Sequence, residues 1–228
     1  LDMKKVGADF GYTLDGGERG ALEAESFSAD GAVAVIHGIS AHPGYAKGKL
    51  VSAIKIAGEF IDSLPKHDWS PETTEGRQGY VHPMHIEGQM EKCTVKFIIR
   101  DFETNLLKEH EDRLEALLKA TVDKYPGARY EFTVSEQYRN MMDVLKDLPH
   151  VTEYARLAME RAGVQPEEHI IRGGTDGSRL SFMGLPCPNI FTGEMGIHSK
   201  DEYVRVKEKQ KAVDTLVQLA QVWEEKTA

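Results

Sequence analysis

The chain has 228 residues, of which 40% are hydrophobic, and a formal net charge of −9 with a sequence pI near 5.5. This length and apolar content suffice for one large or two smaller packed domains. The acidic balance argues against a general binder of nucleic acids or anionic membranes, because such binding depends on clustered Lys and Arg.

Targeting and redox signals are sparse. No apolar run approaches the roughly 18 residues that a membrane span needs, and the first residues lack the apolar core of a signal peptide, which favours a cytoplasmic location. Cys93 and Cys187 are too few for a disulfide framework, so both are interpreted as small buried hydrophobes. The chain begins with Leu1 rather than Met, which suggests a processed or truncated product.

Hydrophobic periodicity predicts alternating strands and helices over the first 140 residues. Pro65 ends the first amphipathic helix, and Pro83 marks an edge strand. The predicted elements are strands at 7–14, 21–27 and 32–37, a helix at 50–64, strands at 80–86 and 93–100, a helix at 107–125 and a strand at 130–134.

The order strand, helix, strand, strand, helix, strand is that of a ferredoxin-like domain, so we predict an inserted βαββαβ unit at residues 27–139. The flanking segments, 1–26 and 140–228, contain helices at 150–162, after Asp176 and near the C-terminus, with a short strand at 188–191. Such an order indicates an α/β domain with a mostly parallel sheet that is covered on both faces.

Asp15 and His198 are candidate metal ligands. Asp15 follows a predicted strand and precedes two glycines, and His198 lies in a Gly-containing loop. Carboxylate oxygen and neutral imidazole nitrogen are the usual zinc ligands besides thiolate. Asp-Gly is equally typical of a simple turn, and a single loop histidine is often a surface residue, so the residues alone leave both interpretations open.

His42 lies between Ser40 and Gly44, where Pro43 and Gly44 fix a turn that displays the imidazole. A displayed imidazole could donate to a developing oxyanion, although a solvent-facing histidine fits the pattern as well. His82 and His85 stand three apart in a predicted strand, where they would face opposite sides, so we predict that they do not chelate a metal together.

Arg172 and Arg100 are candidate anion-binding residues. Arg172 opens the stretch 172–178, where glycines precede a helix whose amides could hold a carboxylate or a peptide carbonyl. The stretch lacks the Gly-Lys-Ser/Thr ending of a nucleotide-binding P-loop, and the chain has no Gly-x-Ser-x-Gly elbow of a serine hydrolase. Arg100 could hold a peptide or pair with Asp101 or Glu103.

Four segments in order, 8–17, 37–44, 172–178 and 196–204, together resemble the peptidase T family. These are zinc-dependent tripeptide aminopeptidases within a wider group that includes carboxypeptidase G, aminoacylase and related dipeptidases. The resemblance runs along essentially the whole chain. It implies a doubly wound zinc-peptidase catalytic domain, present here in part at residues 1–26 and 140–228, that is interrupted by a lid or dimerisation domain at 27–139.

The resemblance also implies roles for single residues. Asp15 resembles the ligand of one zinc and His198 the ligand of the other, so that a complete site would hold two zinc ions. His42 resembles a lid histidine that stabilises the oxyanion, while Arg100 and Arg172 resemble groups that hold the peptide. The implied function is a metallo-aminopeptidase that releases the N-terminal residue of tripeptides through a water activated by two zincs, with a homodimer formed through the lid.

One part of the family pattern has no counterpart here. The segment that supplies the first His ligand, the bridging Asp, a Glu ligand and the Glu general base is not found, so we expect the isolated chain to be inactive and to bind zinc weakly. Two alternatives stay open: a related zinc amidohydrolase or dipeptidase, and a non-catalytic lid-type module for dimerisation or peptide binding.

Overall fold

The computed structural model describes residues 2–227 and divides the chain into two compact units. Unit 2 is the continuous segment Ser28–Tyr138, and unit 1 contains the described residues up to Phe27 and from Arg139 onward. The predicted domain borders differ from these by one residue on each side. The outer ends of the first and last predicted domains, Leu1 and Ala228, lie outside the described residues.

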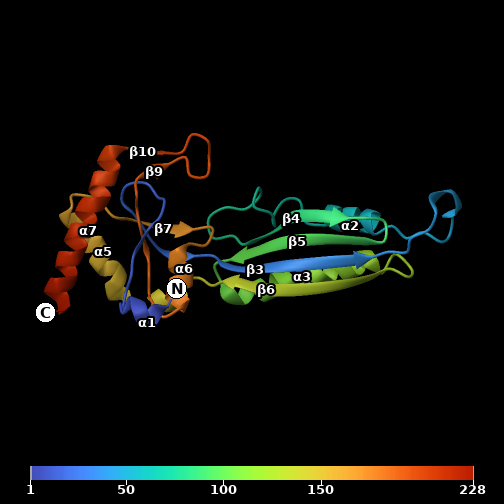
Figure 1. Ribbon diagram of the computed structural model, residues 1–228, viewed down its shortest axis with the longest axis horizontal. Helices are drawn as coiled ribbons and strands as arrows, with labels where there is room; N and C mark the ends of the chain where they lie inside the picture. The colour runs from blue at the N-terminus through green and yellow to red at the C-terminus, as the bar shows by residue number, and fades with distance from the viewer. Residues whose placement is uncertain (1, 228) are drawn as a thin grey trace. The chain divides into compact units, whose positions relative to one another are not determined.

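Unit 2 has the βαββαβ order of a ferredoxin-like fold, as the sequence predicts (Figure 1). Its four strands form an antiparallel sheet in the order β4-β5-β3-β6. Its elements are β3 (Ser28–His37), the 3₁₀ turn η1 (Pro43–Tyr45), α2 (Ala53–Asp62), β4 (Tyr80–Gly88), β5 (Lys92–Asp101), α3 (Thr104–Val122) and β6 (Arg129–Tyr138).

Side-chain alternation along β5 determines which face of this sheet is covered. Every second residue from Cys93 to Ile99 is buried against α2 and α3, where Phe60 and Leu114 belong to the same hydrophobic core. Burying a side chain such as Phe97 contributes about 1.5–3 kcal/mol. The residues between them point to the other face, which no helix of this unit covers.

A β-bulge in β4 changes the predicted placement of two histidines. His82 pairs with Ile98 and His85 with Lys96, so Met84 is an extra residue between two otherwise regular pairings. Because Ile98 and Lys96 share a face of β5, both histidines lie on that face. The prediction that they face opposite sides is therefore wrong, because strict alternation holds only without a bulge.

Unit 1 contains a four-stranded mixed sheet in the order β1-β8-β2-β7. β1 (Thr13–Leu14) runs parallel to β8 (Asn189–Ile190), β2 (Ala21–Ser26) runs parallel to β7 (Glu167–Ile171), and β2 and β8 are antiparallel. The strand predicted at 7–14 is shorter than expected, since α1 (Met3–Val6) precedes it and regular pairing starts only at Thr13.

Helices cover both faces of this sheet. Leu22 and Ile190 are paired across β2 and β8 and belong to the core formed with α5 (Pro149–Arg161) and α7 (Val206–Thr227). Thr13 and Asn189 point to the opposite face, where Gly177 of α6 (Asp176–Phe182) packs so closely that a Cβ would lie 3.1 Å from the Thr13 hydroxyl. The covering on both faces is as predicted.

The remaining elements of unit 1 are short. They are α4 (Met142–Leu145) and the hairpin of β9 (Glu194–Met195) and β10 (Tyr203–Val204). Among residues 2–227 there is no helix with the length and apolar content needed to cross a membrane.

Candidate metal centre and substrate-binding residues

Asp15 is placed by the parallel pairing of β1 with β8. Because the two strands run in the same direction, the residues that follow them emerge at the same edge of the sheet. The two continuations stay side by side: the backbone N–H of Thr192 donates to Gly16 O and that of Gly193 to Gly17 O, both at 2.9 Å. Asp15 itself is exposed at this edge.

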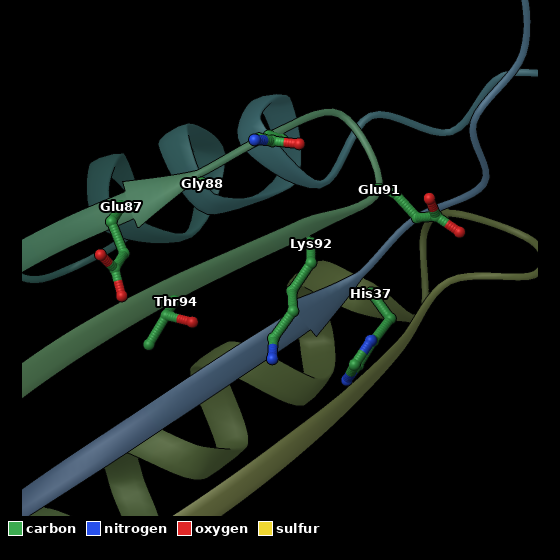
Figure 2. A pocket seen from close by; sticks show the side chains of 7 residues that line it. His37, Glu87, Gly88, Glu91, Lys92 and Thr94 are labelled. Carbon is green, nitrogen blue, oxygen red and sulfur yellow. The ribbon is translucent and has the colours of Figure 1, made fainter.

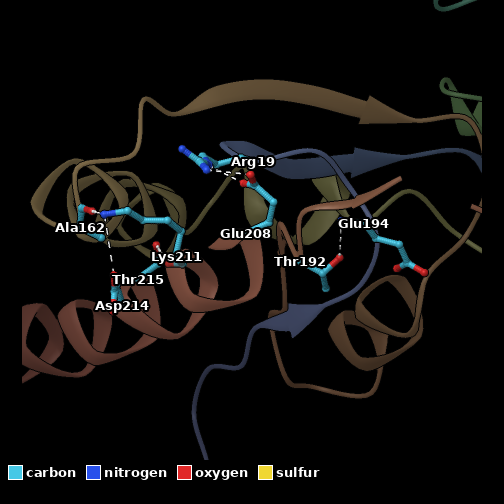
Figure 3. A network of polar contacts seen from close by, with 8 residues as sticks. All are labelled: Arg19, Ala162, Thr192, Glu194, Glu208, Lys211, Asp214 and Thr215. Carbon is cyan, nitrogen blue, oxygen red and sulfur yellow. Dashed lines mark hydrogen bonds and ion pairs between the residues drawn. The ribbon is translucent and has the colours of Figure 1, made fainter. Parts of the chain in front are cut away.

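Gly193 allows the second continuation to pass close to α7. Its φ is 79°, and a Cβ there would lie 2.2 Å from the Cβ of Glu208, so only glycine fits without a shift. Thr192, just before Gly193, turns the chain. Its hydroxyl donates to Gly16 O at 3.0 Å, and it accepts the N–H of Glu194 at 3.3 Å (Figure 3). These contacts bring Glu194 to the edge that carries Asp15.

His198 lies in the loop between β9 and β10 and is exposed. Its φ of 63° is the one positive value for a non-glycine residue among residues 2–227. A left-handed conformation is uncommon for a non-glycine residue and is held here by Glu202, whose Oε2 accepts the backbone N–H of His198 at 2.6 Å. This hydrogen bond holds the backbone at His198, and the side chain is exposed.

Negative charge accumulates around Asp15 and His198. A hydrogen bond with Glu202 raises the pKa of Glu194, and partial burial and the charges of Glu202 and Asp15 raise it further, whereas His198 lowers it. Burial raises the pKa of Glu23, and the charge of Asp15 raises it further, whereas the hydrogen bond from Asn189 lowers it. A cation would relieve this crowding of carboxylates.

The donor set is nevertheless incomplete. Among the residues that the structure describes, no three His, Cys, Asp or Glu side chains are grouped so that they could hold a metal ion. Asp15 and His198 have the chemistry of zinc ligands, but further ligands would be needed to complete either coordination sphere.

Arg172 follows β7 and precedes α6. Its guanidinium lies over the Phe27 ring, 5.1 Å from the centroid. The Thr175 hydroxyl accepts the Ser178 N–H at 3.2 Å in a capping box, so the start of α6 already has a partner for that amide. The predicted anion-binding site at 172–178 therefore consists of Arg172 and the backbone amides at the start of α6 that the capping box does not use.

His42 is exposed and begins the 3₁₀ turn η1 of unit 2. Its Nδ1 accepts the N–H of Gly44 at 3.2 Å, and its ring lies against Tyr45 with centroids 5.3 Å apart. Because Nδ1 acts as an acceptor, the hydrogen of the neutral ring is on Nε2, which leaves an N–H directed away from the turn. A single N–H donor of this kind suits the stabilisation of an oxyanion.

Arg100 is largely buried in unit 2. One guanidinium nitrogen donates to Asp30 O and Ile99 O at 3.1 and 2.9 Å, and the other terminal nitrogen donates to Gln137 Oε1 at 2.9 Å. The suggested alternative, pairing with Asp101 or Glu103, is wrong, because the guanidinium donates to those three oxygens. Asp101 lies 2.9 Å from His110, and Glu103 lies 3.6 Å from Arg77. Part of the guanidinium is therefore committed to the fold.

The five residues predicted from sequence fall into both units: Asp15, Arg172 and His198 in unit 1, and His42 and Arg100 in unit 2. Sequence reasoning did not single out Glu194 and Glu202, which contact the His198 loop. The available signal was their position within the same short segment as His198, with acidic residues four apart on either side of it.

A family model for the peptidase dimerisation domain (M20_dimer) matches residues 17–126. The match begins before β2 and ends before β6, so it does not coincide with unit 2, whose sheet β6 completes. The chain thus contains a segment that matches this dimerisation domain.

The chain is a homologue of peptidase T. It is 42% identical to peptidase T of Clostridium perfringens over 99% of its own length and 41% identical to that of Vibrio parahaemolyticus over 97%. It spans about half of these relatives, 55% and 54% respectively.

Solved structures share the fold. Aminopeptidase PepT of Bacillus cereus superposes with a TM-score of 0.78 at 24% identity, over 97% of this chain and 59% of that one. A dinuclear metal-binding peptidase of the M20 family from Bacillus subtilis superposes with a TM-score of 0.66 at 18% identity, over 96% of this chain and 57% of that one.

Proposed function

We propose that the protein acts as part of a zinc-dependent aminopeptidase that releases the N-terminal residue of tripeptides. The observation that carries this proposal is the 42% identity to peptidase T over 99% of the chain. The exposed Asp15 and His198, in a region crowded with carboxylates, support a metal site at the edge of the unit 1 sheet.

In this proposal Asp15 and His198 each hold one of two zinc ions. The other ligands come from a part of the enzyme that these 228 residues do not include. Zinc supplies Lewis acidity, which polarises a carbonyl and lowers the pKa of a water. The Nε2–H of His42 donates to the oxyanion that forms from the peptide carbonyl. Arg172, and the part of the Arg100 guanidinium that the fold leaves free, hold the peptide by its carboxylate or carbonyl oxygens.

The partners in this proposal are small peptides and a second copy of the chain, the latter through unit 2, in keeping with the described role of the matching domain. The incomplete donor set among the described residues favours the second candidate, a non-catalytic module for dimerisation or peptide binding, for these residues acting alone.

A chimaera tests the proposal. The 228 residues replace the matching part of the Clostridium perfringens relative, and hydrolysis of Leu-Gly-Gly is measured with zinc present. We expect cleavage by the chimaera, loss of at least about 100-fold in kcat/KM in Asp15→Asn and His198→Ala, and no change in the control Asp214→Asn on α7.

Three outcomes would contradict parts of the proposal. A well-folded chimaera that cleaves N-acyl amino acids but no tripeptide identifies an amidohydrolase instead. A chimaera without any hydrolysis favours the non-catalytic module. Tripeptide cleavage or tight binding of two zincs by the 228 residues alone refutes the expectation that their metal site is incomplete.

A further inference from the structure

The helix-free face of the unit 2 sheet concentrates positive charge. Lys92, Lys96 and Arg100 alternate along β5 with the residues that are buried beneath the helices, so all three lie on this face. The strand register adds side chains from β3, β4 and β6. The charged and titratable residues of the face are Lys92, Lys96, Arg100, Arg129, His37, His82, His85, Glu87 and Glu131.

Four cations therefore stand against two carboxylates on one face of a chain whose net charge is −9. Both carboxylates already have partners. Glu131 lies 3.0 Å from His37 Nε2 and 3.3 Å from Arg129, and Glu87 lies 3.6 Å from His85. The excess charge of the face is thus not neutralised within it.

Lys92 and Lys96 account for this excess. Both are exposed, and neither ammonium group has an acidic partner within 4 Å among the described residues. The lysines of α3 differ, since Lys108 and Lys119 each lie 2.5 Å from an aspartate one turn further along. Two lysines without acidic partners attract an anionic ligand electrostatically, even on a protein whose net charge is negative.

An open groove of about 750 Å³ lies at the Lys92 end of the face. Figure 2 shows the Lys92 side chain extended over β3, with His37 on one side and Thr94 and Glu87 on the other. Glu91 stands at the turn before β5. The groove therefore offers an ammonium and a hydroxyl, together with carboxylates that would repel a densely charged polyphosphate.

This mixture fits a peptide with separate carboxylates. Lys92 and Lys96 are about 13 Å apart along the strand, a span that an extended peptide of about four residues covers and that flexible lysine stems adjust to shorter ones. Nucleic acid fits less well, because its closely spaced phosphates would also lie against Glu87 and Glu91, whereas a short peptide can place its few carboxylates at the lysines alone.

We infer that the helix-free face of unit 2, from the groove at Lys92 along β5 to Lys96, binds the carboxylates of acidic peptides. The inference rests on the proposed function for the view that peptides are the ligands, and it adds a preference for acidic ones. The attraction is electrostatic, so it decreases as salt shortens the Debye length from about 30 Å at 0.01 M to about 8 Å at 0.15 M.

Titration calorimetry of the 228-residue chain with triglutamate tests this inference. We expect binding at low salt that weakens as salt is added, no binding of triglutamine, and a loss of at least about 10-fold in affinity in the double variant Lys92→Ala/Lys96→Ala. The control Lys108→Ala/Lys119→Ala removes the same charge from α3 and is expected to keep the wild-type affinity. Circular dichroism checks that both variants are folded.

The inference is overturned if triglutamate does not bind the wild-type chain, if the Lys92/Lys96 variant binds as well as the wild type, or if the control loses as much affinity. Tighter binding of a DNA duplex than of triglutamate, lost in the Lys92/Lys96 variant, would also overturn it. These readouts do not involve hydrolysis, so they are independent of the chimaera test of the aminopeptidase.

Discussion

At the scale of single residues, each unit holds two carboxyl groups in hydrogen-bond contact. Glu194 meets Glu202 beside the His198 loop in unit 1, and Glu111 of α3 meets Asp30 of β3 in unit 2. Burial, followed by the hydrogen bond with Asp30 and its charge, raises the pKa of Glu111 from 4.5 to about 7. The first pair adjoins the candidate metal ligands, whereas the second joins a helix to the sheet.

The Glu111 pair predicts a pH dependence of stability. Because the folded state raises the pKa of Glu111, its protonated form stabilises the fold below pH about 4.5, and this contribution disappears as the pH rises through about 7. After allowance for solvent screening we expect a change on the order of 1 kcal/mol. Urea denaturation at pH 5 and pH 8 should show that Glu111→Gln removes this part of the decline.

The exposed Glu109 of the same helix provides the control, since Glu109→Gln should leave the pH dependence as in the wild type. An unfolding free energy of Glu111→Gln that falls between pH 5 and pH 8 as steeply as that of the wild type would show that Glu111 is not the group responsible.

The position of a site residue could be predicted only where it follows from the neighbouring residues in the sequence. Asp15 directly follows a strand and precedes Gly16, so its position at a sheet edge follows from the sequence. The Glu194–Glu202 contact depends on the β9–β10 pairing, in which Val204 stands opposite Glu194. No local pattern determines the register of two strands of two residues, so this contact could not be predicted.

At the scale of elements, one buried polar chain fastens the end of β5 to α3 and to the loop after α2. The Trp69 indole N–H donates to His110 Nδ1 at 2.8 Å, and His110 Nε2 lies 2.9 Å from Asp101 Oδ2. Trp69 and Asp101 are 3% and 4% exposed, so neither can turn to water for a replacement partner. Arg113 covers the Trp69 ring, 4.4 Å from its centroid.

The variant His110→Leu should therefore destabilise unit 2 markedly. It leaves a buried indole N–H and a buried carboxylate without their shared partner, which costs about 2 kcal/mol or more. Urea denaturation followed by the fluorescence of Trp69 measures the loss. The exposed His67, changed to Leu, should shift the unfolding free energy by less than about 0.5 kcal/mol. Equal effects of the two changes would refute the role of His110.

The elements differ in how well their sequences predict them. β5 alternates between buried and outward residues from Lys92 to Ile99, so its two faces follow from the sequence, and its predicted limits of 93–100 differ from the observed ones by one residue at each end. The sequence does not predict β7, because the strand lies at an edge of the sheet, four of its five residues are exposed, and its residues do not alternate between apolar and polar. The β4 bulge was missed as well, because Met84 looks locally like any other strand residue and becomes an extra one only through pairing with β5.

At the scale of the whole molecule, the hydrophobic cores follow the two units. The largest core lies entirely between Ala32 and Phe132, within unit 2. The other two consist only of residues of unit 1, including Leu22, Leu219 and Trp223. The sequence order suggested an inserted domain, and the separate cores give that insertion a physical basis, since each unit buries its apolar side chains within itself.

Separate cores predict separate responses to mutation, and each unit contains one of the two tryptophans of the chain. Trp223→Phe leaves Trp69 to report on unit 2, and Trp69→Phe leaves Trp223 to report on unit 1. Phe97→Ala removes a side chain that is 2% exposed in the unit 2 core, at a cost of about 3–5 kcal/mol. The urea midpoint reported by Trp69 should fall accordingly, while that reported by Trp223 stays unchanged.

Leu219→Ala in α7 is the reciprocal change, because Leu219 is 5% exposed in the unit 1 core. It should lower the Trp223 midpoint by the equivalent of about 2–5 kcal/mol and leave the Trp69 midpoint in place. Midpoints that shift together in both variants would mean that the chain unfolds as one cooperative unit, because destabilising either core would then destabilise the whole. Independent shifts would mean that unit 2 is held by its own core, as expected of a domain inserted between β2 and α4.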